Sequence, residues 1–245
     1  MKALYGKMTP SDGKYEGATA NGKRSGKGTF EWNSGEKYEG EWQDDKITGQ
    51  GKFTAANRDT YIGDYVDGKR HGRGKQTYAD GSSYDGDWEN DLRQGEGKFV
   101  YPDQGYYQGR WENNCQHGKG KEHYSNGEYY EGDYKFDERT GAGEYRYENG
   151  DVYKGDFVQN RRHGFGKYLF SNGDVYEGDW VQNRREGTGG YEWLDEDRHE
   201  GKFVNNMIQG PGVRFFRSGI RMTATWEERK VTGKQKPNFE YQKKK

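Results

Sequence analysis

Aliphatic side chains are scarce in this 245-residue chain, and their scarcity argues against an ordinary hydrophobic core. Hydrophobic residues make up 28% of the sequence, aromatic residues alone make up 16%, and charged residues make up 33%. Such a chain normally stays disordered, because it buries too little apolar surface to offset its conformational entropy. A net charge of −1 and a content of 21 tyrosines, 11 phenylalanines and 7 tryptophans argue against disorder, since these rings supply buriable surface.

Several other features are missing, and each excludes a class of protein. Cys115 is the single cysteine, which excludes an internal disulfide and a cysteine-based metal cluster and fits a reducing compartment. No apolar run approaches the length of a membrane span, and residues 1–4 do not resemble a signal peptide. The 40 basic residues balance 41 acidic ones, which is not the charge of a nucleic-acid-binding protein. We therefore expect a soluble intracellular protein that binds no nucleic acid.

A repeat of 23 residues occupies nearly the whole chain without insertion or deletion. Ten copies in one register are a far stronger signal than a single motif match. The first residues of the ten repeats are Tyr15, Tyr38, Tyr61, Tyr84, Tyr107, Tyr130, Tyr153, Tyr176, His199 and Met222.

Each repeat carries glycine and aromatic residues at fixed offsets from its first residue. Glycine recurs at offset two, an aromatic at offset four, and a Gly-x-Gly pair at offsets eleven and thirteen. Further aromatics recur at fifteen and seventeen, and glycine at twenty. Residues of one parity share one face of a strand, so rings from one strand are predicted to lie over glycines of its neighbour. The pattern predicts two strands per repeat and an aromatic-on-glycine core.

Asn, Asp and Gly occupy the segments between these strands, and they tolerate the positive backbone angles of tight turns. Each repeat is therefore predicted to be one β-hairpin, joined to the next by a second short turn. Twenty short strands in sequence order predict an all-β fold, an elongated antiparallel meander of tandem 23-residue hairpins. We expect a lead-in over residues 1–14, ten repeats over residues 15–233 with the last one degenerate, and a basic tail over residues 234–245.

Some repeats depart from the pattern. Arg58, Gln104 and Glu196 stand where glycine is expected at offset twenty. We expect these three turns to differ in shape from the others, and Gly105 predicts a one-residue shift in the second. Thr19 replaces the aromatic at offset four of the first repeat, as terminal copies of repeat arrays usually deviate.

These repeats resemble the MORN repeat (membrane occupation and recognition nexus), whose pattern runs Tyr-Glu-Gly-Glu-Trp, a polar turn, then Gly-x-Gly and an aromatic. The resemblance covers about residues 15–233 and implies a twisted β-hairpin array used as a scaffold. The closing repeats look more narrowly like those of the radial spoke head MORN proteins of motile cilia. That likeness rests on Glu186-Gly187-Thr188, on His199 with Glu200-Gly201-Lys202-Phe203, and on Gly210-Pro211-Gly212.

The narrower resemblance implies a structural subunit of the axonemal radial spoke head, located in the cytoplasm and cytoskeleton, at the ciliary axoneme. Its implied partners are the other spoke head subunits, a second MORN protein and the central apparatus. An alternative from another class is a cytoskeletal MORN scaffold that binds a membrane surface or phosphoinositides through basic hairpin loops.

No catalytic, cofactor-binding or metal-binding residues are predicted. His71, His117 and His163 share offset ten in alternate repeats, about 19 Å apart by strand spacing, which is too far for one metal ion. The Gly-x-Gly pairs lack the helix that follows a phosphate-binding loop. Paired carboxylates such as Glu39 and Glu41 recur along the array, as expected for a solvent-exposed sheet face. A general acid/base pair would instead need two different environments to separate its pKa values. We therefore expect neither enzyme activity nor a cofactor.

Two groups of residues are predicted to contact partners. Basic pairs at equivalent positions of the hairpin loops predict a broken row of positive charge, although the plainer interpretation is that they balance neighbouring carboxylates. Tryptophans at offset four are expected on an exposed aromatic face that docks a partner. The candidates are Trp42, Trp88, Trp111, Trp180, Lys69, Arg70, Arg161, Arg162, Arg184 and Arg185.

Overall fold

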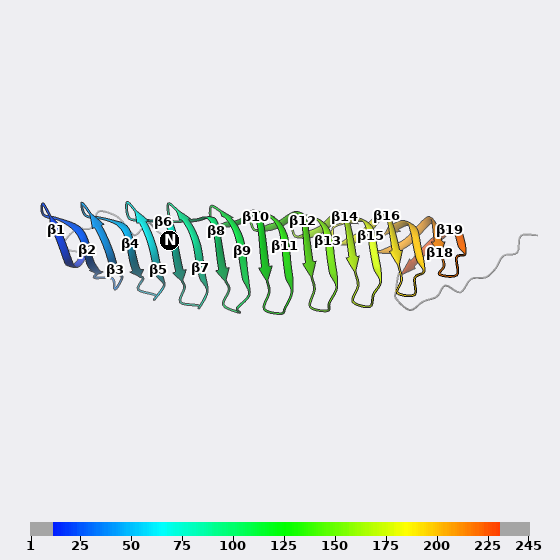
Figure 1. Cartoon of the computed structure of the whole chain (residues 1–245), viewed down its shortest axis with the longest axis horizontal. Coiled ribbons are helices and arrows are strands. Elements are labelled where there is room, and N and C mark those ends of the chain that lie inside the picture. The colour runs from blue at the N-terminus through cyan, green and yellow to red at the C-terminus, as the bar shows by residue number, and fades with distance from the viewer. Residues whose placement is uncertain (1–11, 231–245) are drawn as a thin grey trace, which may run out of the picture. The chain divides into compact units, whose positions relative to one another are not determined.

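The structure is a computed structural model that describes residues 12–230. The predicted tail, the last glycine of the predicted array at Gly233 and most of the predicted lead-in lie outside the described residues. The chain divides into two compact parts, an N-terminal lobe (Met1–Glu138) and a C-terminal lobe (Arg139–Lys245). Each lobe is built from β-strands joined by short turns (Figure 1).

The strands follow one another at short, regular intervals in both lobes. In the N-terminal lobe they are β1 (Gly13–Ala20), β2 (Lys23–Trp32), β3 (Lys37–Gln43), β4 (Lys46–Thr54), β5 (Thr60–Val66), β6 (Lys69–Thr77), β7 (Ser83–Glu89), β8 (Leu92–Val100), β9 (Tyr106–Glu112), β10 (Cys115–His123) and β11 (Tyr129–Lys135). From the lobe boundary onward they are β12 (Glu138–Arg146), β13 (Val152–Val158), β14 (Arg161–Leu169), β15 (Val175–Val181), β16 (Arg184–Glu192), β17 (Arg198–Val204), β18 (Met207–Phe215) and β19 (Arg221–Lys230).

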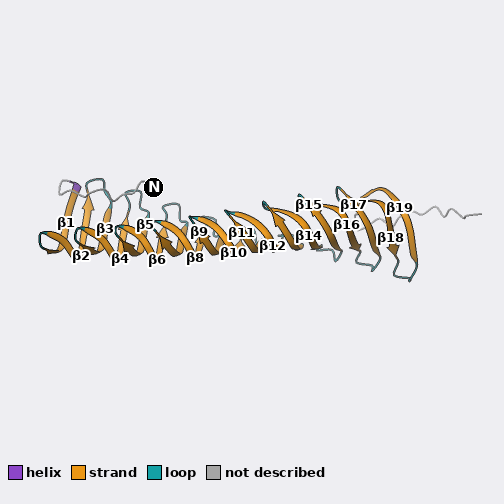
Figure 2. Ribbon diagram, turned by 90° about the horizontal axis from the view of Figure 1, so that it is seen from above, coloured by secondary structure: helices purple, strands orange, loops and turns teal. Residues whose placement is uncertain are grey.

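Within each lobe, every strand pairs antiparallel with the strand that follows it in the sequence, from β1 to β11 and from β12 to β19. Figure 2 shows these successive strands with their short connections. The all-β antiparallel meander of hairpin repeats is confirmed. A twentieth strand would follow Lys230, outside the described residues.

The hairpin turn inside each repeat has two residues with positive φ, as in Asp44 (φ 48°) and Asp45 (φ 70°). Two central residues of this kind define a type I′ turn, whose twist matches that of the flanking strands. This is why Asn, Asp and Gly recur at offsets six and seven. Phe136 (φ 51°) takes the same conformation without the short polar side chain that favours it.

A β-bulge follows each hairpin turn. Gly40 pairs with Gly51, but its neighbour Glu41 pairs with Thr48, so the partner strand carries extra residues around Gly49, whose φ is 60°. The second strand of most repeats also ends at offset sixteen, as β6 does at Thr77, whereas β2 runs to Trp32 at offset seventeen. The prediction of one regular strand through offsets eleven to seventeen is therefore wrong at the bulge, and it is wrong at offset seventeen in every described repeat but the first.

The glycines at offsets two and thirteen form a row across the strands. Gly51 pairs with Gly40 on one side and with Gly63 on the other. A Cβ atom on Gly40 or Gly51 would overlap the ring of Tyr38, and one on Gly63 would come within 2.6 Å of Tyr61 Oη. The predicted packing of rings over glycines of the neighbouring strand is confirmed.

Tyrosines at offset zero alternate with the rings at offset four along the core. Tyr38 packs edge-on against Trp42 of its own repeat at 5.3 Å between centroids, and against Tyr65 of the next repeat at 5.4 Å. Edge-to-face pairs at this distance add stability beyond the area they bury. Because each ring contacts its neighbours in both directions, the core runs along each lobe as a line of rings.

The turns between repeats keep one shape despite their different sequences. The backbone N–H of Gly35 donates to Trp32 O at 2.9 Å, and that of Arg58 donates to Ala55 O at the same distance. Arg58, Gln104 and Glu196 adopt positive φ (74°, 72° and 70°) where other repeats have glycine. The expectation of differently shaped turns, with a one-residue shift at Gln104, is wrong, because inter-strand hydrogen bonds fix the backbone whatever side chain it carries.

Candidate functional site

The predicted tryptophan contacts are in the core. Trp42, Trp88, Trp111 and Trp180 are 2–3% exposed. Trp42 Nε1 donates to Gly28 O at 3.2 Å, and Trp88 Nε1 donates to Gly74 O at 3.0 Å, so even their polar atoms bind the preceding repeat. The prediction that these rings form an exposed docking face is wrong, because each ring is covered by the first-position rings on both sides.

The second residue of each predicted basic pair is also structural. The guanidinium of Arg70 lies 4.1 Å from the ring centroid of Trp88, and its Nε donates to Asp91 Oδ1 at 3.1 Å. Arg162 lies 4.5 Å from the Trp180 ring, and the equivalent Arg185 is buried. A guanidinium over an aromatic face is stabilised by the ring quadrupole. These arginines connect successive repeats and are not presented to partners.

The first residue of each basic pair points to solvent. Lys69, Arg161 and Arg184 are exposed at the starts of β6, β14 and β16. Of the predicted contact residues, these three are the ones that the structure leaves accessible. The sequence placed both members of a pair in one loop, whereas strand alternation sends them to opposite faces.

Acidic residues at offset three have a role that the sequence interpretation missed. Asp64 Oδ2 accepts from the backbone N–H of Arg73 at 2.8 Å, and Asp87 Oδ2 accepts from that of Glu96 at 2.8 Å. These carboxylates satisfy a donor that the β-bulge takes out of the strand ladder. The signal was in the sequence as a recurring Asp or Glu at offset three.

Aspartates at offset twenty-one join repeats in the C-terminal lobe. Asp151 accepts from Tyr168 Oη at 2.6 Å and from the backbone N–H of Ser171 at 2.7 Å. Burial acts to raise the pKa of Asp151, but these hydrogen bonds outweigh it and hold the pKa below its ordinary value. Burial raises the pKa of Tyr168, so the pair stays a hydroxyl donating to a carboxylate.

His199 replaces the first-position tyrosine and is 1% exposed. Its ring packs edge-on against Trp226 at 5.2 Å, and neither ring nitrogen has a hydrogen-bond partner. Burial, with a smaller contribution from the charge of Arg214, lowers the pKa of His199 to about 4. The imidazole is therefore neutral at physiological pH.

Nothing among residues 12–230 assembles the groups of a metal or nucleophile site. No three His, Cys, Asp or Glu side chains there come together to hold a metal ion. Burial raises the pKa of the Cys115 thiol, which disfavours the reactive thiolate. In the same part of the chain, no helix has the length and hydrophobicity needed to cross a bilayer.

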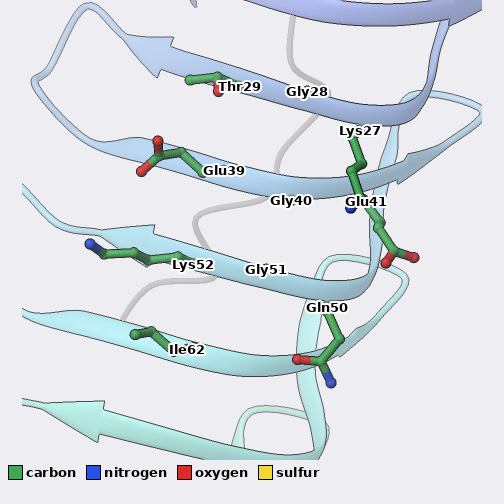
Figure 3. Close-up of a pocket in the computed structure, with 10 residues that line it drawn as sticks. All are labelled: Lys27, Gly28, Thr29, Glu39, Gly40, Glu41, Gln50, Gly51, Lys52 and Ile62. Atoms are coloured by element: carbon green, nitrogen blue, oxygen red, sulfur yellow. The ribbon is translucent and has the colours of Figure 1, made fainter.

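A hollow lies over β2 to β5, on the face opposite the rings (Figure 3). Its floor is the glycine row of Gly28, Gly40 and Gly51, with charged and polar side chains at both ends. Because the floor is bare backbone already paired in the sheet, the hollow offers few convergent donors or acceptors. It is a consequence of the glycine row.

The protein-family comparison matches nine tandem copies of the MORN repeat, at residues 15–37, 38–60, 61–83, 84–106, 107–129, 130–152, 153–175, 176–198 and 199–221. The chain belongs to the MORN repeat family. The matched boundaries coincide with the 23-residue repeats, and the tenth repeat stays a prediction. For this MORN repeat protein, the family indicates a structural repeat with a scaffold role or a role in binding proteins or membranes.

Comparison with solved structures gives distant similarities. The TCP domain of SAS-4 (dCPAP) from Drosophila melanogaster, solved in complex with a proline-rich motif of Ana2 (dSTIL), is 13% identical with a TM-score of 0.41, over 72% of this chain and 90% of that one. The TCP10 domain of Danio rerio CPAP, as its E1021V mutant, is 13% identical with a TM-score of 0.27, over 80% and 97%. A streptogramin B lyase is 14% identical with a TM-score of 0.17, over 84% and 63%.

These TM-scores are too low to support an inference about function. A search of curated proteins gave no significant match. The family assignment therefore rests on the MORN repeats themselves.

Proposed function

We propose that this MORN repeat protein is a non-enzymatic scaffold subunit of the axonemal radial spoke head. The observation that carries the scaffold role is the unbroken series of nine matched repeats, in which ring, glycine, arginine and carboxylate positions all serve contacts between strands or repeats. The likeness of residues 186–188, 199–203 and 210–212 to closing repeats of spoke head MORN proteins supports the specific location. Its partners would be other spoke head subunits, a second MORN protein and the central apparatus.

A repeat sheet of this kind presents surfaces suited to assembly. Within residues 12–230, β1 has a paired neighbour on one side only, which is β2. A strand edge with free backbone groups can recruit another chain by strand addition. Tyr15 in that strand is only half-buried, whereas Tyr38 is fully buried.

Loss of the protein tests this proposal. Cells lacking it should assemble axonemes whose radial spokes lack part of the head, and ciliary beating should be impaired. The measurement is the subunit composition and the averaged image of isolated spokes from mutant and rescued cells. Complete spoke heads in the mutant would show that the proposal is wrong.

Membrane binding, the alternative scaffold role, has weaker support. Lipid recognition by charge generally uses a cluster of about four to eight basic residues. The second arginine of each basic pair faces inward, as Arg70 and Arg162 do, so only one residue of each pair could join such a cluster. The exposed cations that remain at the start of the second strands are Lys23, Lys46, Lys69, Arg161 and Arg184, which is at most one per hairpin turn.

A further inference from the structure

Two successive hairpin turns in the C-terminal lobe carry the same five residues. Val-Gln-Asn-Arg-Arg occupies residues 158–162 and again residues 181–185. Both turns have the positive φ pair of a type I′ turn, so they present equivalent side chains in equivalent geometry. In the N-terminal lobe, by contrast, no two turns share these five positions. The duplication places two like surfaces side by side.

The exposed cations of these two turns are not neutralised. Arg184 Nη1 donates to the neutral amide of Asn205 at 3.0 Å, and Arg161 has no carboxylate partner among the described residues. In the N-terminal lobe, Lys46 Nζ lies 2.7 Å from Asp67 of the next turn. The next turns in the C-terminal lobe have glutamine and asparagine at those positions, so nothing there replaces the carboxylate.

The carboxylates near these cations already accept hydrogen bonds from the backbone. Asp179 Oδ2 accepts from the backbone N–H of Thr188 at 2.8 Å, and Asp156 Oδ2 accepts from that of Phe165 at 3.3 Å. Glu186 Oε1 accepts from the backbone N–H of Asn205 at 3.0 Å. These bonds hold the three carboxylates on backbone N–H groups of the sheet.

Apolar side chains lie beside these cations. Val158 is the cross-strand partner of Arg161, and Val181 is the partner of Arg184, so each valine shares a face with its arginine. Val158 is 47% exposed, Val181 is 42% exposed, and Phe165 between them is 56% exposed. These five residues form what we call the tip patch.

We propose that the tip patch binds an acidic, amphipathic helical segment of a partner protein. Equivalent positions in adjacent repeats are two strands apart, which is about 10 Å. Seven residues of an α-helix also rise about 10 Å, so carboxylates at heptad spacing meet both arginines, while apolar residues that alternate with these carboxylates meet Val158 and Val181. This inference rests on the proposed scaffold function and states which chemistry one of its contacts recognises.

A protein segment fits this patch better than a membrane does. Two cations provide a weak electrostatic attraction to anionic lipid, below that of a typical polybasic cluster. The same two cations at a fixed spacing suit a partner that carries charges at a matching spacing. The exposed valines and Phe165 then add the apolar contact that such a helix needs.

The test uses the full-length chain and two fluorescent helical peptides of about 21 residues, about 30 Å long. One peptide has glutamate at every seventh position with leucine three residues later, and the other has the same composition in scrambled order. Fluorescence anisotropy should show that the patterned peptide binds more tightly than the scrambled one. Binding should weaken between about 50 and about 300 mM salt, because the ion pairs are solvent-exposed.

The double variant R161Q/R184Q should weaken binding of the patterned peptide about tenfold, since two exposed ion pairs are lost. The matched control K46Q/K69Q changes two lysines at equivalent positions of the N-terminal lobe and should leave binding unchanged. All four side chains are exposed, and circular dichroism checks that both variants stay folded.

Three results would overturn the proposal. They are equal binding of the patterned and scrambled peptides, no effect of R161Q/R184Q, and an absence of peptide binding.

A separate experiment measures sedimentation with vesicles of phosphatidylcholine and phosphatidylserine. Arginine-dependent binding to these vesicles without peptide binding would assign the patch to membranes instead. None of these failures bears on the spoke head location, which is tested in cells.

Discussion

At the scale of single residues, the chain shows how a repeat tolerates an exception. The tyrosine hydroxyl at offset zero normally donates to a carbonyl three residues on, as Tyr176 does to Asp179 O at 2.9 Å. His199 fills the same space but leaves both ring nitrogens without hydrogen bonds. A buried polar group without a partner destabilises the fold.

The first prediction concerns the pH dependence of stability. The folded-state pKa of His199, about 4, lies below the unfolded value of about 6.5, so the unfolded chain binds the proton more readily. His199 should therefore lower the free energy of unfolding as pH falls from about 6.5 to about 4, by an amount on the order of 2–3 kcal/mol. Urea unfolding at a series of pH values measures this loss.

His199→Tyr should remove that pH dependence and raise stability, because it restores the ring and hydroxyl of the repeat. His71→Gln, at a half-buried position in the N-terminal lobe, should keep the wild-type slope. If His199→Tyr retains the full slope, His199 is not the group responsible.

The second prediction concerns the glycine row. Gly63→Ala should destabilise the protein by about 2–3 kcal/mol, because the added Cβ would lie 2.5 Å from both Arg73 O and Gly74 Cα. Gly81→Ala should cost about 1 kcal/mol, because Gly81 has open space around it and only its φ of 88° is unfavourable. Thermal unfolding of both variants compares these costs. Equal losses would show that close packing over the row is not the constraint.

At the scale of elements, hydrogen bonding fixes the turns more strongly than the residues in them do. Gln104 keeps the same hydrogen bond to the start of its turn, 3.1 Å from Tyr101 O, that glycine makes elsewhere. A side chain at positive φ carries a cost of about 1–2 kcal/mol relative to glycine. The positive φ angles of Arg58, Gln104 and Glu196 are therefore local backbone strain that the sheet imposes.

The third prediction is that relieving this strain stabilises the protein. Arg58→Gly and Gln104→Gly should each raise the free energy of unfolding by about 0.5–1 kcal/mol, since part of the gain is lost to the greater freedom of glycine in the unfolded chain. The control Glu148→Gly, in an equivalent exposed turn but at a position without positive φ, should be neutral or destabilising. A stabilising control, or destabilising test variants, would contradict the explanation.

The strands and turns were predictable because the same weak local pattern recurs in every repeat. Alternation of Tyr38, Gly40 and Trp42 predicts a strand, and the Asp44-Asp45 pair predicts its turn. The bulge at Gly72 was not predictable from parity, because parity does not show that the backbone N–H of Arg73 leaves the strand ladder and donates to Asp64 Oδ2. Burial of the tryptophans was missed for a similar reason, since the groups that cover Trp42, such as Tyr15 and Arg24, come from the preceding repeat.

The candidate contact residues were only half predictable. The sequence identified the basic pairs, but the separation of Arg161 from Arg162 depends on strand alternation after the turn. What sets the exposed arginines of the C-terminal lobe apart is the lack of a carboxylate in the following turn. That comparison between repeats can be made only once the inter-repeat contacts, such as Lys46 with Asp67, are known.

At the scale of the whole molecule, stability should be the sum of repeat and neighbour contributions. Each repeat contacts adjacent repeats through the same rings and backbone pairs, so whole repeats should be interchangeable. Removing part of a repeat should shift every later side chain out of register with its partner.

The fourth prediction follows from this modularity. Deleting residues 61–83 joins Thr60 to Tyr84, keeps the repeat register, and should leave a folded β-protein that unfolds at a somewhat lower temperature. Deleting residues 61–71 should instead abolish cooperative unfolding, because it removes one strand and part of a bulge. Circular dichroism during heating distinguishes the two. Similar melting of both variants would show that the 23-residue register does not govern the fold.

The most direct test of the proposed role as a spoke head scaffold is the location of the tagged chain in fractionated motile cilia. We predict that the chain stays with the axoneme after detergent extraction and co-purifies with spoke head subunits in a constant ratio. Recovery in the membrane or soluble fraction, without spoke head subunits, would contradict the proposed scaffold role.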